Sequence, residues 1–118
     1  MYSPQLLDHF EHPRNAGEPA DADARIRVEN PACGDILELF AKVREGKIAE
    51  ICFKAKGCVP AMACGSLITE MAKGKLPAEV NAVSREEVVE KIGGLPAGSG
   101  HAAQLAVDAL RQLISRLK

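Results

Sequence analysis

Aromatic residues make up only 3% of this 118-residue chain, and tryptophan is absent. Stacking platforms for unpaired bases need aromatic rings, so this composition argues against single-stranded nucleic acid as a ligand. The formal net charge of −1 gives no excess of positive charge for binding a phosphate backbone or an anionic membrane. The sequence also lacks an apolar run long enough to span a bilayer. We therefore expect no nucleic acid partner and no membrane partner.

A secretory signal is not evident either. The opening residues, Met1-Tyr2-Ser3-Pro4, do not show a basic segment followed by an apolar one. We therefore expect a cytoplasmic protein whose cysteines are reduced. In a secreted protein, the four cysteines would instead allow three disulfide pairings. An apolar content of 47% is sufficient for one core, so residues 1–118 are expected to form a single domain.

Alternation of apolar and polar residues in the N-terminal half predicts three short β-strands, in residues 25–29, 35–43 and 48–56. Residues 44–47 are typical of a hairpin turn, in which Gly46 can take a positive φ. In the third strand, strict alternation places four apolar side chains inward: Ala49, Ile51, Phe53 and Ala55. Such a sheet has one apolar face, which helices must cover.

Four helices are predicted around this sheet. Their start signals are a capping residue or a proline, at Ser3-Pro4, at Pro60 and at Ser84, and the last helix begins near His101. The expected fold class is α+β, with a small three-stranded antiparallel sheet and helices packed on one face.

Several side chains that bind metals lie at the predicted ends of elements, where functional groups are commonly found. Cys33 and Asp35 flank Gly34 and point the same way if the chain is extended there. Cys58 lies between a strand and a helix, where the positive helix end favours a thiolate, and His101 follows a glycine-rich loop. Thiolate, carboxylate and imidazole are ligands of a soft or borderline metal centre. Because there is no C-x-x-C pair, these residues must converge through the tertiary fold.

Each of these residues also has a purely structural interpretation. Cys33 and Cys58 could be small buried apolar side chains, Asp35 could cap a turn, and His101 could simply begin a helix. Cys64 shares a helical stripe with residues expected in the core, which favours burial. It nevertheless lies about one turn into the helix that starts beside Cys58, so it remains an additional candidate metal ligand.

The remaining thiol, Cys52, falls between the inward-facing Ile51 and Phe53, so it is expected to face away from the core and from the metal site. Thiol catalysis, with Cys58 activated by His101, is an alternative from the enzyme class. It requires a substrate pocket, and the sequence does not indicate one.

A series of short segments gives the chain a further, collinear pattern: Tyr2-Ser3, Asp8-His9-Phe10, residues 12–17, Pro31-Ala32-Cys33-Gly34-Asp35, Phe53-Lys54, Gly57-Cys58, residues 60–63, residues 66–70, Lys73-Gly74-Lys75, and Gly94-Leu95-Pro96 leading to His101. In this order they resemble the IscU/NifU N-terminal family of iron–sulfur cluster assembly scaffolds over nearly the whole chain. Agreement along the sequence is more specific than any one of these motifs.

The resemblance implies a three-stranded sheet with packed helices and a site formed by Cys33, Asp35, Cys58 and His101. It implies a scaffold more than an enzyme. A cysteine desulfurase delivers sulfur as a persulfide, iron arrives, electrons reduce the sulfur, and a transient [2Fe–2S] cluster passes to acceptor apo-proteins. An electron or iron donor is a further partner that this scheme allows. Zinc can occupy such a site in place of iron.

The chain departs from the family pattern at the third motif, where the family has His-Cys and this sequence has His101-Ala102. Three explanations follow. Cys64 replaces the lost thiol; or Cys33, Asp35, Cys58 and His101 act alone, with a weaker cluster or a single metal ion; or the chain is a degenerate relative that binds zinc or regulates a desulfurase. Since the other site positions are intact, a functioning scaffold is the favoured explanation.

A second departure lies in the segment that a dedicated chaperone recognises in the family, Leu-Pro-Pro-Val-Lys. Here it reads Leu95-Pro96-Ala97-Gly98-Ser99. We therefore do not expect the dedicated chaperone to dock through this segment.

Overall fold

The computed structural model describes residues 2–31 and 34–117, in which five helices and three strands occur. In chain order, the elements are α1 (Pro4–Glu11), β1 (Ala24–Asn30), β2 (Asp35–Arg44), β3 (Lys47–Lys56), α2 (Val59–Ala72), α3 (Pro77–Asn81), α4 (Arg85–Lys91) and α5 (Gly100–Arg116). The strands form one antiparallel sheet in the order β1-β2-β3. The predicted α+β class is confirmed.

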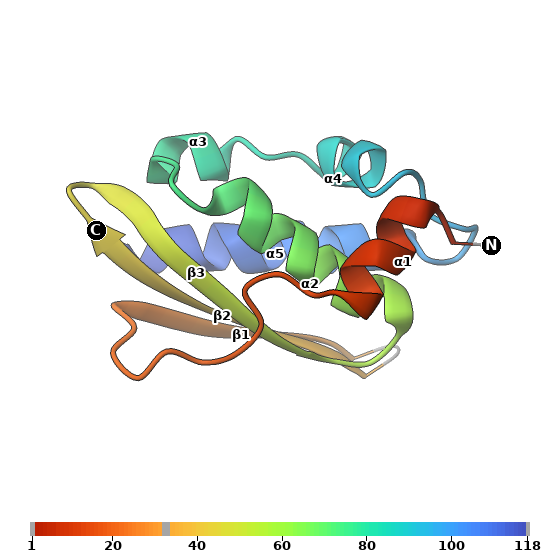
Figure 1. Ribbon diagram of the computed structural model, residues 1–118, viewed down its shortest axis with the longest axis horizontal. Helices are drawn as coiled ribbons and strands as arrows, with labels where there is room; N and C mark the ends of the chain where they lie inside the picture. The colour runs from red at the N-terminus through yellow and green to blue at the C-terminus, as the bar shows by residue number, and fades with distance from the viewer. Residues whose placement is uncertain (1, 32–33, 118) are drawn as a thin grey trace.

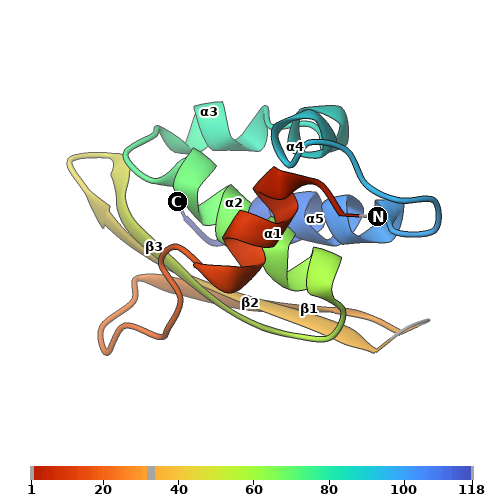
Figure 2. The same ribbon diagram turned by 45° about the vertical axis from the view of Figure 1, so that its right-hand side comes forward.

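The helices lie on one side of the sheet (Figures 1 and 2). α2 and α5 pack directly against the strands, α1 packs on α2, and α3 and α4 pack on α5. The core between these layers is built from fully buried side chains, which include Leu37 and Leu39 from β2, Ile68 from α2 and Leu110 from α5. This burial supplies the main stabilisation of the fold and fixes where each element ends.

The predicted start of the first helix is confirmed by its cap. The Ser3 hydroxyl accepts a hydrogen bond from the Leu6 N–H at 2.9 Å and donates one to the Ile92 carbonyl. The first hydrogen bond satisfies a free N–H group of the helix end. The second connects the start of α1 to the end of α4.

The hairpin turn between β2 and β3 lies where it was predicted, but the pairing of the two strands shifts by one residue close to the turn. Lys42 pairs with Glu50, whereas Val43 pairs with Ile48, so Ala49 is an extra residue in β3. This bulge reverses the alternation: Ile48 is fully buried and Ala49 only half-buried. The prediction that Ala49 faces inward as part of a regular strand is therefore wrong.

The short helix α3 was not predicted from the sequence. Pro77 occupies its first turn, and the Glu79 carboxylate accepts a hydrogen bond from the Leu76 N–H at 2.9 Å. Proline at a helix start and an acidic residue two positions later are both favourable there. Its five residues are too few for a recognisable apolar period.

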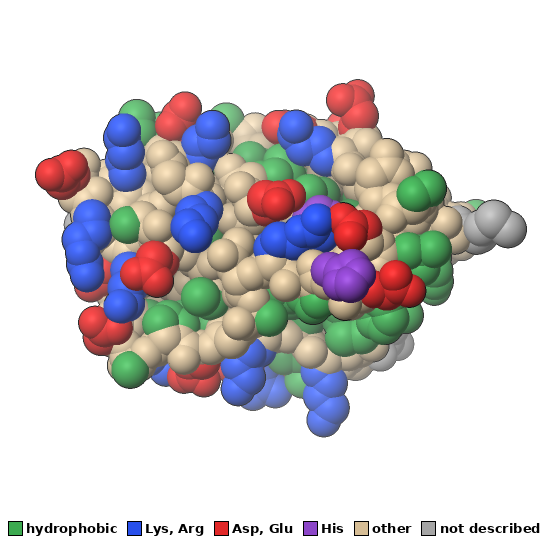
Figure 3. Space-filling model, viewed as in Figure 1, with side chains coloured by type: hydrophobic (Ala, Val, Ile, Leu, Met, Phe, Trp, Pro, Cys, Tyr) green, Lys and Arg blue, Asp and Glu red, His purple; other side chains and the backbone are tan. Residues whose placement is uncertain are grey.

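Four element ends meet at one end of the molecule. β2 begins there and β3 ends there, and both α2 and α5 begin there, on the right in Figure 1. Elsewhere on the face seen in Figure 3, positive and negative side chains are interspersed. The convergence of these four ends gathers side chains that are far apart in the sequence.

Candidate metal centre

Asp35, the first residue of β2, is the buried acidic group of this end of the molecule, with 2% of its surface exposed. Its Oδ1 accepts a hydrogen bond from the Cys58 N–H at 3.0 Å. Gly57 makes this contact possible, because a Cβ at that position would overlap the Asp35 carboxylate. Gly57 also has a φ of +142°, which disfavours other residues. The glycine before Cys58 is thus required by the carboxylate beside it.

Cys58 is the N-cap residue of α2 and is half-buried. Its Sγ lies 3.3 Å from Asp35 Oδ2, a distance at which the thiol can donate a hydrogen bond to the carboxylate. The positive end of the helix dipole favours a negative charge at this position. The local structure therefore suits a thiolate ligand for a cation.

His101 lies in the first turn of α5, and its side chain is 34% exposed. Its Nε2 is 3.3 Å from Asp35 Oδ2 and 3.8 Å from Cys58 Sγ. The other ring nitrogen, Nδ1, is 3.0 Å from the Gly98 carbonyl oxygen. One edge of the imidazole therefore faces the thiol and the carboxylate, while the opposite edge is held by the backbone.

One donor atom from each of Asp35, Cys58 and His101 lies within 4.8 Å of the others. A small shift of these atoms around one cation would bring sulfur, oxygen and nitrogen into coordination distance. Cys33, the fourth predicted site residue, lies outside the described residues. The structure thus brings together three of the four principal candidates, and their role as ligands remains a prediction.

Cys64 does not lie in this group. It is fully buried in the core, as its helical phase predicts, and burial raises the pKa of its thiol to about 12, helped by the charge of Cys58. Ala102, where the family has a cysteine, is also buried, with 1% exposed. A thiol in the environment of Cys64 resists ionisation, which is unfavourable for a metal ligand.

Cys52 is half-buried in β3, opposite Phe40 of β2. Burial raises the pKa of its thiol, with a smaller contribution from Glu50. Phe40 alternates along β2 with Leu39 and Ala41 of the core, so Phe40 and the opposite Cys52 lie on the sheet face away from the helices. Cys52 is therefore placed as predicted, apart from the candidate centre.

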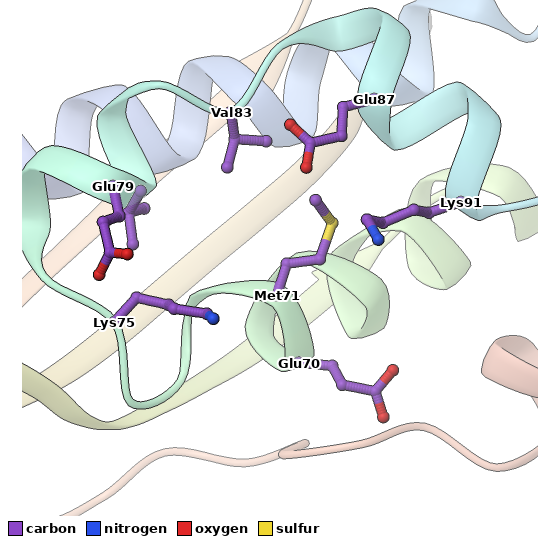
Figure 4. Close-up of a pocket in the computed structure, with 8 residues that line it drawn as sticks. Glu70, Met71, Lys75, Glu79, Val83, Glu87 and Lys91 are labelled. Carbon is purple, nitrogen blue, oxygen red and sulfur yellow. The ribbon is translucent and has the colours of Figure 1, made fainter.

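Of the hollows in the surface, one lies beside the centre and others lie away from it. A pocket of about 250 Å³ is lined by His101 together with Glu29 and Asp108, which leaves the imidazole accessible from solvent. The pocket of about 280 Å³ in Figure 4 lies between α2, α3 and α4 and is lined by charged residues around Met71. None of the candidate ligands lines this second pocket. The candidate ligands thus lie at an edge of the molecule that solvent can reach.

A separate polar cluster joins α1 to α2 and was missed by the sequence analysis. Ser66, fully buried, lies 2.8 Å from His9 Nδ1 and accepts a hydrogen bond from the Arg14 N–H at 2.8 Å. His9 Nε2 lies 3.6 Å from Glu70. Burial lowers the pKa of His9, and the nearby Arg14 acts in the same direction. This cluster holds the N-terminal segment in place; a serine at a core position of α2 was its only sequence signal.

Comparison with known proteins identifies a family for this chain. Residues 1–118 match the family described as the NifU-like N terminal domain. The chain is 46% identical over 114 residues to the iron-sulfur cluster assembly scaffold protein IscU 1 of Archaeoglobus fulgidus, covering 97% of this chain and 74% of that relative. It is 39% identical over 121 residues to the scaffold protein IscU of Escherichia coli, covering 99% and 94%.

A solved structure shares the fold. The N-terminal part of a NifU-like protein from Brucella abortus superposes with a TM-score of 0.78 at 19% identity, covering 98% of this chain and 92% of that one. The fold and the site thus define a small α+β domain with a candidate soft-metal centre at one end. The chain belongs to the NifU-like N-terminal domain family, which confirms the resemblance found in the sequence.

No helix within residues 2–31 and 34–117 has the length and apolar character needed to cross a membrane.

Proposed function

We propose that this protein is a scaffold on which [2Fe–2S] clusters are assembled before they pass to other proteins. The observation that carries the proposal is the convergence of Cys58, Asp35 and His101, with donor atoms within 4.8 Å of one another. Relatives at 39–46% identity are named as iron–sulfur cluster assembly scaffolds, which supports the same role here. The reduced thiols that this role needs fit the cytoplasmic location expected from the sequence.

The proposed ligands of the cluster are Cys33, Cys58, Asp35 and His101. Thiolates bind iron strongly, whereas a carboxylate oxygen is a harder and weaker partner for an iron–sulfur centre. Asp35 therefore keeps the cluster exchangeable. His101, at the start of α5, completes the set of ligands on the side of the centre that is open to solvent. A cluster held in this way can be assembled and released, which is what a scaffold requires.

Sulfur is proposed to come from a cysteine desulfurase as a persulfide. A scaffold thiolate attacks the outer sulfur of the donor persulfide, forming a new S–S bond while the donor cysteine leaves as a thiolate. Each transferred sulfur must then gain two electrons to become sulfide, so an electron donor takes part along with a source of iron. The finished cluster goes to acceptor apo-proteins. The altered segment of residues 95–99 makes docking of the dedicated chaperone there an unfavoured route.

Ala102 leaves the centre with one thiol fewer than the family pattern. Replacement by Cys64 requires the start of α2 to open, because Cys64 is fully buried and its thiol pKa is about 12. The proposal therefore relies on the two cysteines Cys33 and Cys58. The expected consequence is a cluster that forms but exchanges readily.

Anaerobic reconstitution with ferrous iron and sulfide tests the proposal. Wild type and Cys52→Ser should both develop the visible absorption of a [2Fe–2S] cluster, because Cys52 lies outside the centre. Cys58→Ala should lose most of that absorption while remaining folded by circular dichroism. A wild-type protein that is folded but forms no cluster, or a Cys58→Ala protein that forms it normally, would contradict the proposal.

Zinc binding is the second candidate function, in a degenerate relative that binds zinc or regulates a desulfurase. The donor set of thiol, carboxylate and imidazole favours it, because zinc accepts these ligands in a tetrahedral site. Metal analysis of purified protein, followed by competition between zinc and ferrous iron in the presence of sulfide, separates the two functions. Persistent zinc that excludes cluster formation would favour the second candidate.

A further inference from the structure

The two ring nitrogens of His101 have different surroundings. Nε2 faces Asp35 Oδ2 at 3.3 Å and Cys58 Sγ at 3.8 Å. Nδ1 lies 3.0 Å from the Gly98 carbonyl oxygen. A carbonyl oxygen can only accept a hydrogen bond, so Nδ1 must carry a proton and donate it. In the neutral ring the lone pair is then on Nε2, which faces Asp35 Oδ2 and Cys58 Sγ, and a cation between these atoms takes the place of the proton that the carboxylate would accept from a charged ring.

The backbone at Gly98 brings its carbonyl to this position. Gly98 has a φ of +87°, in the left-handed region that favours glycine. The Ser99 N–H donates to the Pro96 carbonyl at 3.0 Å, which closes a turn around it. Nothing lies within 4 Å of a Cβ built on Gly98. The requirement for glycine there is therefore conformational and does not come from lack of space.

The loop that carries Gly98 is held on both sides. The Ala102 N–H donates to the Ser99 carbonyl at 3.1 Å, so the turn continues directly into α5. From α4, the Arg85 guanidinium lies so close to Gly100 that a Cβ there would approach Nη2 to 2.5 Å. These contacts limit the positions that the Gly98 carbonyl can take relative to the imidazole.

We infer that Gly98 is a positioning residue for His101, whose carbonyl selects the tautomer that presents Nε2 to the metal. The inference rests on the proposed function, in which His101 is a ligand. Metal-binding histidines generally donate their second ring N–H to a carboxylate or a backbone carbonyl, which fixes the ring and its tautomer. The inference also means that residues 96–98 orient His101. These residues lie in the segment where this sequence departs from the chaperone-recognition pattern.

The first test is nuclear magnetic resonance of the histidine side chains in metal-free wild type. Long-range proton–nitrogen spectra distinguish protonated Nδ1 from protonated Nε2, and His101→Asn assigns the signal among the three histidines. At a pH where titration shows the ring to be neutral, His101 should carry its proton on Nδ1. After addition of zinc, Nε2 should shift as a metal-bound nitrogen. A proton on Nε2, or zinc on Nδ1, would overturn the inference.

The second test compares two glycines of the same loop region. Gly94 also has a positive φ, +93°, with open space for a Cβ, but its carbonyl is not a partner of His101. Gly98→Ala should give a mixture of His101 tautomers and weaken zinc binding about 10-fold or more. Gly94→Ala should keep the wild-type tautomer and affinity. Equal behaviour of the two variants would contradict a special role for Gly98.

A third variant keeps the test valid if Gly98→Ala folds poorly. Asparagine tolerates a positive φ better than alanine, so Gly98→Asn should retain both the Nδ1 proton and the zinc affinity. A folded Gly98→Asn protein in which His101 no longer carries its proton on Nδ1 would contradict the inference. The ring spectra of metal-free protein need no cluster, so a scaffold that fails to assemble clusters is recognised separately from a misassigned Gly98.

Discussion

The Cys58 N–H donates a hydrogen bond to Asp35 Oδ1 over 3.0 Å, which joins the end of β3 and the start of α2 to the start of β2. The same carboxylate reaches the Cys58 thiol and the His101 imidazole through its other oxygen. A buried carboxylate thus connects two other candidate ligands of the centre. The stability of this end of the molecule and its affinity for metal should therefore change together.

Gly57→Ala tests that coupling. A Cβ at residue 57 would overlap the Asp35 carboxylate, so this variant should lose about 2 kcal/mol or more of unfolding free energy and bind zinc at least about 10-fold more weakly. Gly46→Ala is the matched control, because Gly46 has a φ of +77° and open space around a Cβ. It should lose only about 1 kcal/mol and bind zinc normally. Urea denaturation and zinc titration measure both quantities.

Ser66→Ala should destabilise the docking of α1 on α2. The substitution leaves the Arg14 N–H and the His9 ring without the hydroxyl that they contact at 2.8 Å, so about 1–3 kcal/mol of unfolding free energy should be lost. Ser115→Ala, which removes an exposed hydroxyl bonded to the Gln112 carbonyl, serves as the control and should change little. Similar losses in the two variants would show that the buried cluster adds no specific stability.

The stability of the protein should fall in mildly acidic solution through His9. Burial holds the pKa of His9 below the ordinary histidine value of 6.5, so the unfolded chain binds a proton more readily than the folded one. Its contribution to stability is therefore complete above about pH 6.5 and is lost as the pH falls below that value. His9→Gln should flatten this part of the profile of unfolding free energy between pH 5 and pH 8. An unchanged acid slope in this variant would rule His9 out as the cause.

Cys64→Ala should leave cluster formation intact. Since Cys64 is fully buried, the variant should lose about 1 kcal/mol of unfolding free energy through the small cavity that it creates. Ala102→Cys, in contrast, should restore the family's missing thiol and increase the yield or lifetime of the cluster. Anaerobic reconstitution of both variants beside wild type provides the comparison. Loss of the cluster in a folded Cys64→Ala protein would identify Cys64 as the replacement ligand.

The sheet and most of the helices could be predicted because their signals are local. Ser3, Ser84 and Pro60 are helix-start signals that depend only on neighbouring residues, and the alternation in β2 reports one buried face. The bulge at Ala49 could not be predicted in this way, because it depends on the pairing of β3 with β2. The short α3 was missed because its five residues are too few for a recognisable apolar period.

The candidate centre shows a sharper limit. Asp35, Cys58 and His101 were recognised by residue type and by resemblance to a family, while no spacing in the sequence indicates that they meet. Their convergence depends on the packing of α2 and α5 on the sheet, which is set by core residues elsewhere. The roles of Gly57 and Gly98 required the coordinates, because a glycine's φ and its close neighbours are tertiary properties.

The central claim is that a cluster built at Cys33, Asp35, Cys58 and His101 can be delivered to another protein. The direct measurement is anaerobic assembly with a cysteine desulfurase, cysteine, ferrous iron and a reductant, followed by separation from those reagents and addition of an apo-ferredoxin. The account predicts that wild type acquires iron and sulfide in equal amounts and that the ferredoxin spectrum then appears as the scaffold loses its own. A folded wild-type protein that gains no sulfide, or a Cys58→Ala variant that delivers clusters equally well, would contradict it.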